Sequence, residues 1–166
     1  MPKLARKCYA TYLDSTFKIG ADSTPAWFLI GKDIEDMSVE LNPNIDTKEN
    51  ILGETAVTDN GFEPQVTADP YYANPTDTIY PKLKSIAMER LKGDDCKTHI
   101  LEVIIEDPSA TKHEAYMEDV VVKPTSYGGD TAGFAIPFDI HFDGNRKKGT
   151  VTITAGVPTF TEGAGE

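Results

Sequence analysis

The residues best suited to acid–base or metal chemistry are the three histidines, His99, His113 and His141, because each has an Asp or Glu near it in the sequence. An imidazole beside a carboxylate can hold a metal ion or move a proton. None of the three, however, belongs to an H-x-x-x-H or H-E-x-x-H run, which would place two ligands on one face of a helix. We therefore interpret them as ordinary surface or rim histidines.

Other candidate sites are equally incomplete. Asp94 and Asp95 fit a turn at a helix end, because no D-x-D-x-D-G run follows them as a calcium loop requires. Cys8 and Cys96 have no metal or redox spacing; one disulfide between them is possible, but two free thiols fit better. The sequence predicts no catalytic residue, no metal site, no cofactor and no enzyme.

The composition indicates one domain, residues 1–166, with a modest core. The hydrophobic fraction is 39%, below the usual figure of about 45–50% for a globular domain. Two explanations fit: long exposed segments, or surface that is buried only on assembly.

The formal net charge of −11 argues against direct gripping of nucleic acid, because phosphate contacts need clustered Lys and Arg. It is compatible with a surface past which nucleic acid slides. The N-terminus lacks the apolar region of a signal peptide, and no apolar run approaches the roughly 20 residues that span a bilayer. The sequence therefore predicts synthesis in the cytoplasm and no membrane partner.

The sequence predicts a β core over residues 25–155, which would position the histidines and acidic residues described above. Hydrophobic patterns predict one helix over 77–92, whose stripe contains Ile79, Leu83, Ile86, Ala87 and Leu91. Predicted strands cover 26–31, 34–41, 99–105, 114–122, 134–142 and 150–155. Strands grouped on either side of a single helix are typical of an α+β fold, mainly antiparallel.

Three regions have no regular period. Residues 1–24 are predicted to form an N-terminal arm, and residues 156–166 a C-terminal tail. Residues 43–75 form a long segment that is too polar for core and too apolar for simple disorder. Asn60 and Gly61 are a strong turn signal, so we expect an extended hairpin or flap with this pair at or near its tip.

Several stretches together resemble the tail tube protein (major tail protein) of bacteriophages with long, non-contractile tails. They are WFLIGKDIEDMSVELNPNIDTKENILGE at 27–54, GFEPQVTADPYY at 61–72, DTIYPKL at 77–83 and FAIPFDIHFDGNRKKGTVTI at 134–153. The resemblance implies two packed antiparallel sheets, in a β-sandwich or barrel-like arrangement, flanked by one helix. It also implies hexameric rings stacked into a tube in the virion tail, through which DNA passes without specific binding. Its implied partners are further copies, the tape measure protein, the tail terminator and the distal tail protein, and its implied place of synthesis is the host bacterial cytoplasm.

Two site hypotheses follow. The first places a polar strand face toward the lumen, where carboxylates repel DNA phosphates within a Debye length of about 8 Å. The residues of that face are Asp36, Ser38, Glu40, Asp139, His141, Thr152 and Thr154. The second places contacts between subunits on the long segment: Ile45, Ile51, Leu52, Glu54, Phe62, Val66, Tyr71 and Tyr72.

Two alternatives remain open from the sequence. A monomeric β-sandwich binding module, such as a carbohydrate-binding domain, could use Trp27, Tyr71, Tyr72 and Tyr127 as a sugar platform, although Trp27 sits in an apolar strand typical of core. Another tail component of similar fold, a terminator or a distal tail subunit, is the second.

Overall fold

A computed structural model describes residues 3–18, 24–32 and 34–163 of the chain. The predicted N-terminal arm and C-terminal tail therefore lie partly outside the described residues. The elements in chain order are η1 (Arg6–Cys8), β1 (Tyr9–Asp14), β2 (Trp27–Ile30), β3 (Pro43–Glu49), β4 (Thr55–Phe62), β5 (Gln65–Ala68), α1 (Tyr80–Glu89), η2 (Gly93–Cys96), β6 (Lys97–Ile104), β7 (His113–Pro124), β8 (Gly128–Asp130), β9 (Gly133–Ala135), β10 (Phe138–Thr154) and β11 (Val157–Glu162). Within the described residues, no helix is long and apolar enough to cross a membrane.

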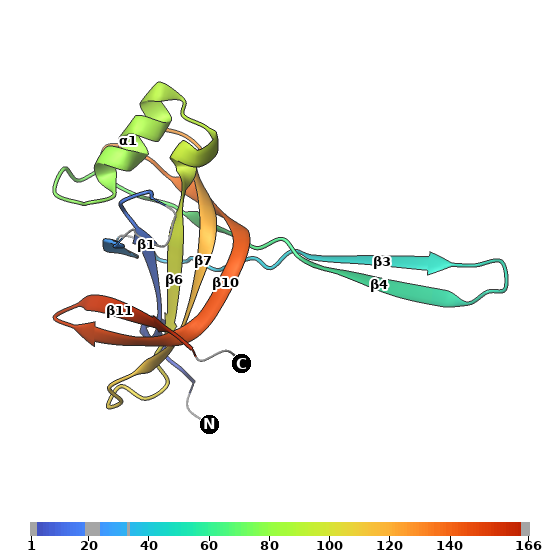
Figure 1. Cartoon of the computed structure of the whole chain (residues 1–166). Helices are drawn as coiled ribbons and strands as arrows, with labels where there is room; N and C mark the ends of the chain where they lie inside the picture. The colour runs from blue at the N-terminus through green and yellow to red at the C-terminus, as the bar shows by residue number, and fades with distance from the viewer. Residues whose placement is uncertain (1–2, 19–23, 33, 164–166) are drawn as a thin grey trace.

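One seven-stranded antiparallel sheet, the main sheet, organises the molecule. Its strand order is β11-β10-β7-β6-β1-β2, and β5 pairs with the first part of β10. The sheet curls, so that β11 turns back toward the side on which β1 lies, and α1 covers one end (Figure 1). The predicted α+β class, mainly antiparallel and flanked by one helix, is confirmed; the layers come from one curled sheet, with β3–β4 and β8–β9 as separate two-stranded sheets.

The core lies on both faces of the main sheet, but in different halves. At the end next to α1, one face packs with the helix through buried residues that include Leu13, Ile100, Val120, Phe138 and Ile140. In the far half, the opposite face carries the second cluster: Tyr12, Leu101, Val103, Ala115 and Val151. Each long strand therefore changes its apolar face part way along.

Strand β10 shows this change most clearly. Phe138 and Ile140 are buried in its first half, whereas Val151 is buried in its second. Two register shifts between Phe142 and Lys147 add two residues to β10 relative to β7, and such bulges bend a strand and increase its twist. Outside the bulged residues 143–146, the odd-numbered residues of β10 therefore share one face, and the even-numbered residues share the other.

The helix is shorter than the predicted span of 77–92. Asn74 Oδ1 accepts hydrogen bonds from the backbone N–H and the hydroxyl of Thr76, which makes a turn of the residues expected to open the helix. Pro81 occupies the first turn, where its missing N–H has no helical partner to lose. The C-cap is Arg90, whose φ of 56° is left-handed, so the helix stops before the predicted end at residue 92.

Three predicted segments are corrected. Tyr9–Asp14 is not an arm: as β1 it lies between β6 and β2 in the main sheet, with Leu13 completely buried. Residues 34–41 are not a strand, because they meet another strand only in the single bridge from Glu40 to Gln65. Val157–Glu162 is not a free tail, because it pairs with β10.

Candidate assembly surface

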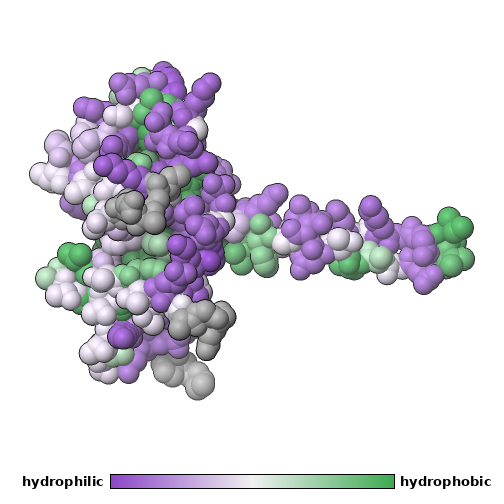
Figure 2. All heavy atoms as spheres, viewed as in Figure 1, coloured by the Kyte–Doolittle hydropathy of each residue, from purple (hydrophilic) through white to green (hydrophobic). Residues whose placement is uncertain are grey.

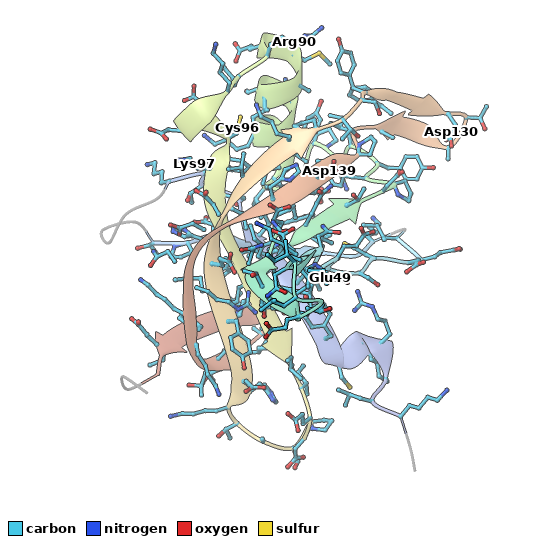
Figure 3. The ribbon with its side chains drawn as sticks, turned by 90° about the vertical axis from the view of Figure 1, so that its right-hand side faces the viewer. Glu49, Arg90, Cys96, Lys97, Asp130 and Asp139 are labelled. Atoms are coloured by element: carbon cyan, nitrogen blue, oxygen red, sulfur yellow. The ribbon has the colours of Figure 1, made fainter. Side chains whose placement is uncertain are left out.

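Strands β3 and β4 form a hairpin that projects far from the body of the molecule (Figure 1). Every residue from 41 to 60 is exposed. Figure 3 views the molecule from the side on which this projecting hairpin emerges, with Glu49 in front of the sheet and Arg90 and Cys96 toward the helix end. The predicted long segment is therefore an extended hairpin over most of its length.

The tip of the projecting hairpin, residues 50–54, presents two apolar side chains on a hydrogen-bonded turn. Asn50 Oδ1 accepts hydrogen bonds from the backbone N–H of Leu52 at 2.9 Å and of Glu54 at 3.0 Å. This arrangement turns the side chains of Ile51 and Leu52 outward, and they are 101% and 76% exposed. Figure 2 shows the hydrophobic cap at this end.

The two faces of the projecting hairpin differ. Ile45, Thr47 and Val57 share one face, because Ile45 pairs with Asp59 and Thr47 with Val57. The other face carries Asp46, Lys48, Thr58 and Asn60, and Asn60 donates a hydrogen bond to Asp46 at 3.1 Å. The first face therefore carries exposed Ile45 and Val57 among polar residues, because Asp59, Glu49 and Thr55 share it by the same register, and the other face is mainly polar.

The expected turn at Asn60 and Gly61 is not at the tip. Pro43 pairs with Phe62 and Ile45 with Asp59, so β4 has one residue more than β3 at this point. Gly61 takes a φ of 88°, in the region that favours glycine. The pair forms a bulge at the base of the hairpin, because the strands run past it without reversing.

The residues predicted to contact neighbours divide into two groups. Ile45, Ile51, Leu52, Glu54 and Phe62 all lie exposed on the projecting hairpin.

Val66 and Tyr71 are instead buried in the fold of their own chain, which corrects their assignment to the interface, whereas Tyr72 is half-buried. Val66 is 1% exposed and pairs with Ile140. Tyr71 is buried, stacks edge-on against Phe28 and Phe138, and donates a hydrogen bond to Asp77 at 3.0 Å.

Tyr72 forms a bridge with Ala135, and its hydroxyl lies 3.3 Å from a carboxylate oxygen of Asp130. These contacts place it against the small β8–β9 sheet.

The residues predicted to line a lumen do not share one face of the main sheet. Asp139 and His141 lie on one face of β10, and Thr152 and Thr154 lie on the other. Their strand has apolar residues on opposite faces in its two halves, which the sequence analysis treated as one inward face. Asp36, Ser38 and Glu40 are exposed on a segment without regular pairing.

The face with Asp139 is polar near the helix end. Asp139 accepts hydrogen bonds from Thr67 at 2.7 Å and from Gln65 at 3.5 Å, and both donors come from β5. His141 is exposed beside them and pairs with Gln65 in the register.

His99 is not the surface histidine that the sequence analysis predicted. It is 9% exposed, and its two ring nitrogens lie 3.3 Å from carboxylate oxygens of Asp14 and Asp119. The three residues come from β6, β1 and β7, so no short spacing in the sequence reports their proximity. Among the described residues no group of three or more His, Cys, Asp or Glu is placed to hold a metal ion.

Asp14 is completely buried and fully bonded. Burial alone would raise the pKa of its carboxyl, but hydrogen bonds from His99, Thr16 and Ala26 outweigh it and hold the pKa below its ordinary value. This carboxylate therefore joins the ends of β1, β2 and β6, and we interpret the cluster as structural.

A second charged cluster lies on the opposite face in the far half. Arg146 Nη1 donates to Glu102 at 2.7 Å and to Glu118 at 2.9 Å, and its guanidinium stacks over Tyr116. Tyr9 also donates to Glu102, and burial together with that carboxylate raises the pKa of the Tyr9 hydroxyl. These carboxylates are buried but have partners, as buried charges require.

An open groove of ≈ 780 Å³ lies between the two edges of the main sheet. Among the described strands, β2 pairs only with β1 and β11 only with β10, and the curl brings these edge strands to the two sides of the groove. We call it the edge groove. Its apolar lining includes Trp27, Met117, Val157, Pro158 and Phe160, and its polar lining includes His99, Asp119, Asn145 and Lys147.

No family model and no curated protein sequence matches the chain. Among solved structures, the fold is similar to that of the sheath/tube terminator of an extracellular contractile injection system (PVC), determined in its extended state. The TM-score is 0.53 and the sequence identity 10%, and the match covers 87% of this chain and 95% of the terminator chain. The two chains share a fold over almost their full lengths.

Proposed function

We propose that this chain is a structural subunit of a phage-type tail, which assembles into hexameric rings that stack into a tail tube. The observation that carries the proposal is the projecting hairpin: its exposed apolar side chains, Ile51 and Leu52 at the tip and Ile45 and Val57 on one face, have no apolar partner among the described residues. An isolated two-stranded hairpin is at best marginally stable in water. A neighbouring subunit would supply the missing contacts.

The free edges of the main sheet support assembly. β2 and β11 each have one unpaired side among the described strands, and unpaired edges promote association unless they are covered. A contact between different patches on successive copies can close into a ring. Six copies is the number that the sequence resemblance implies.

The charge of the chain fits a conduit for DNA. A subunit with a formal net charge of −11 does not hold phosphates. Within the proposal, the face with Asp139 and His141 lines the lumen, and Thr152 and Thr154 face away from it. An assembled structure with Asp139 on the outer wall would contradict this part.

The place and partners follow from the same proposal. The subunit is made in the host bacterial cytoplasm and works in the virion tail, next to the tape measure protein, the tail terminator and the distal tail protein. The proposal assigns it no catalytic step, and the DNA passes without specific binding.

A tail terminator is the second candidate, favoured by the fold shared with the PVC terminator over 87% of this chain. A terminator caps a tube, so it would form single rings that do not stack. The two candidates therefore differ in whether purified protein forms tubes or stops at rings.

The test replaces residues 44–61 with an Asn-Gly turn, which suits a two-residue hairpin. The replacement must stop before β5, because Val66 is buried in the core. We expect size-exclusion chromatography and negative-stain microscopy to show tubes for the intact chain and folded monomers for the shortened chain. Tubes formed by the shortened chain would show that the hairpin is not the connector, and an intact chain that stays monomeric at every concentration would contradict the proposal.

A further inference from the structure

The edge groove and the hairpin tip are complementary in polarity. The groove is lined by Trp27, Met117 and Phe160, all half-buried, and by Val157, which is 61% exposed. Its volume falls within the range of about 300–1,000 Å³ that is typical of binding pockets. It is therefore large enough for the side chains of the tip.

The unpaired charges are complementary as well. The two carboxylates of the groove already have partners, because Glu118 binds Arg146 and Asp119 lies against His99, whereas Lys147 makes no ion pair with any described residue. Glu49 precedes the tip and Glu54 is its last residue, and neither makes an ion pair within the described residues. A tip seated in the groove would bring these unlike charges together at a partly water-excluded contact, where attraction is stronger than in bulk water.

The two features lie on opposite sides of the subunit. In Figure 1 the projecting hairpin extends to one side, and β11 turns to the other. A tip therefore reaches the groove of a second copy, whose own tip remains available for a third. This head-to-tail arrangement continues from copy to copy.

We infer that residues 50–54 of one copy bind in the edge groove of the next, with Ile51 and Leu52 against Trp27, Val157 and Phe160. The inference rests on the proposed function, because it names the receptor for the connecting hairpin. The tip acts as an anchor within a larger interface, since a stable interface commonly buries about 1,600 Å² in total.

Cross-linking between two differently labelled copies tests the contact directly. One copy carries Leu52→Cys, the other Val157→Cys, and both carry Cys8→Ser so that the half-buried native thiol does not compete. We expect a disulfide-linked dimer on oxidation. In the matched control the second copy carries Met88→Cys, at an exposed position on α1, in place of Val157→Cys. We expect no disulfide-linked dimer from this control pair. Equal dimer yields from the two pairs, or no dimer from the Leu52→Cys and Val157→Cys pair, would overturn the inference.

A charge exchange provides the second measurement. Lys147→Glu should raise the apparent dissociation constant of assembly, measured by sedimentation, by about tenfold or more, as for an interface hot spot. Combining it with Glu49→Lys and Glu54→Lys should restore assembly. Failure of Lys147→Glu to weaken assembly, or no recovery in the combined variant, would exclude the groove as receptor.

The two proposals fail in different ways. If Ile51→Ser with Leu52→Ser leaves assembly unchanged, the hairpin does not connect subunits and the proposed function loses its main support. If that variant remains monomeric while Val157→Glu and Lys147→Glu assemble normally, only the receptor is wrong. Circular dichroism and the unfolding midpoint of each variant confirm that its subunit is folded.

Discussion

The β6–β7 hairpin and the projecting β3–β4 hairpin are built by the same kind of antiparallel pairing, yet one is buried and the other is bare. Leu101 and Val103 of β6 are completely buried, whereas no residue of β3 is even half-buried. The main sheet surrounds β6 with strands on both sides and core on both faces. Backbone pairing alone therefore defines a hairpin's shape, and packing against other elements defines its stability.

The largest expected difference in the free energy of unfolding comes from a Phe→Ala substitution made once in the main sheet and once in the projecting hairpin. Phe138→Ala removes a ring that is 1% exposed and packs edge-on against Tyr71, so we expect a loss of about 3–5 kcal/mol in the free energy of unfolding.

Phe62→Ala is the matched change on the hairpin, where the ring is 59% exposed; its effect on the monomer should stay within about 0.5 kcal/mol. Denaturant unfolding below the assembly concentration measures both. Similar losses for the two variants would contradict the contrast.

The charged cluster in the far half should give the next effect. Arg146→Met leaves Glu102 and Glu118 without their cation, and their side chains are 9% and 8% exposed. Because the arginine itself is 42% exposed, we expect a loss of about 2–3 kcal/mol, below the 3–5 kcal/mol typical of breaking a fully buried pair.

The control is Lys148→Met, which removes a pair 3.6 Å long between exposed groups. Its cost should be below about 1 kcal/mol. Chemical denaturation at neutral pH compares the two, and an equal cost would show that burial does not strengthen this cluster.

Acid should weaken the body through Asp14. The folded pKa of this carboxyl lies below its unfolded value, so its contribution is complete above the unfolded pKa of about 3.9 and is lost as pH falls through the folded pKa. Asp14→Asn removes that contribution, and hydrogen bonds to a charged group are worth about 1.5–3 kcal/mol.

Urea unfolding of both proteins between neutral pH and the acid limit should therefore show a stability gap that closes below about pH 4. A gap that is constant with pH would mean that the Asp14 carboxylate does not supply it.

Apart from the control variants, the smallest expected effect lies at the hairpin tip. Asn50→Ala removes the acceptor for the N–H groups of Leu52 and Glu54, which should open the hairpin locally at a cost of about 1 kcal/mol. Hydrogen exchange should speed up in β3 and β4, while the unfolding midpoint of the body stays unchanged, because regions open independently. Faster exchange in the main sheet as well would contradict this separation.

The sequence predicts the helix stripe and the alternation at Phe138 and Ile140 because each pattern reflects burial against a single surface. It misses β1, because that strand is buried on both faces around Leu13 and so has no alternation to detect. The sequence also predicts a strand at residues 34–41 that the structure does not contain. Met37 is buried and Val39 half-buried, as the alternation requires, but only Glu40 pairs with another strand. Alternation reports which side faces the core, not whether a partner strand is present.

The assembly surface is predictable in part for the same reason. Ile45, Ile51 and Leu52 stand out as apolar residues without a local partner, and they prove to be exposed. Val66 is also an apolar residue without a local partner in the sequence, but it pairs with Ile140 of β10, more than seventy residues later. The edge groove has no local signal at all, because it exists only where the curl brings β2 and β11 together.

The bulge at Gly61 sets the direction in which the projecting hairpin leaves the main sheet. Nothing lies within 4 Å of the position that a Cβ would occupy at Gly61, so its φ of 88° and not crowding restricts replacement. A residue that reset this angle would swing the distant tip through an arc while leaving the body intact. In the proposed assembly, where every copy repeats this joint, such a change would accumulate, so one backbone angle at Gly61 would help to set the curvature and pitch of the tube.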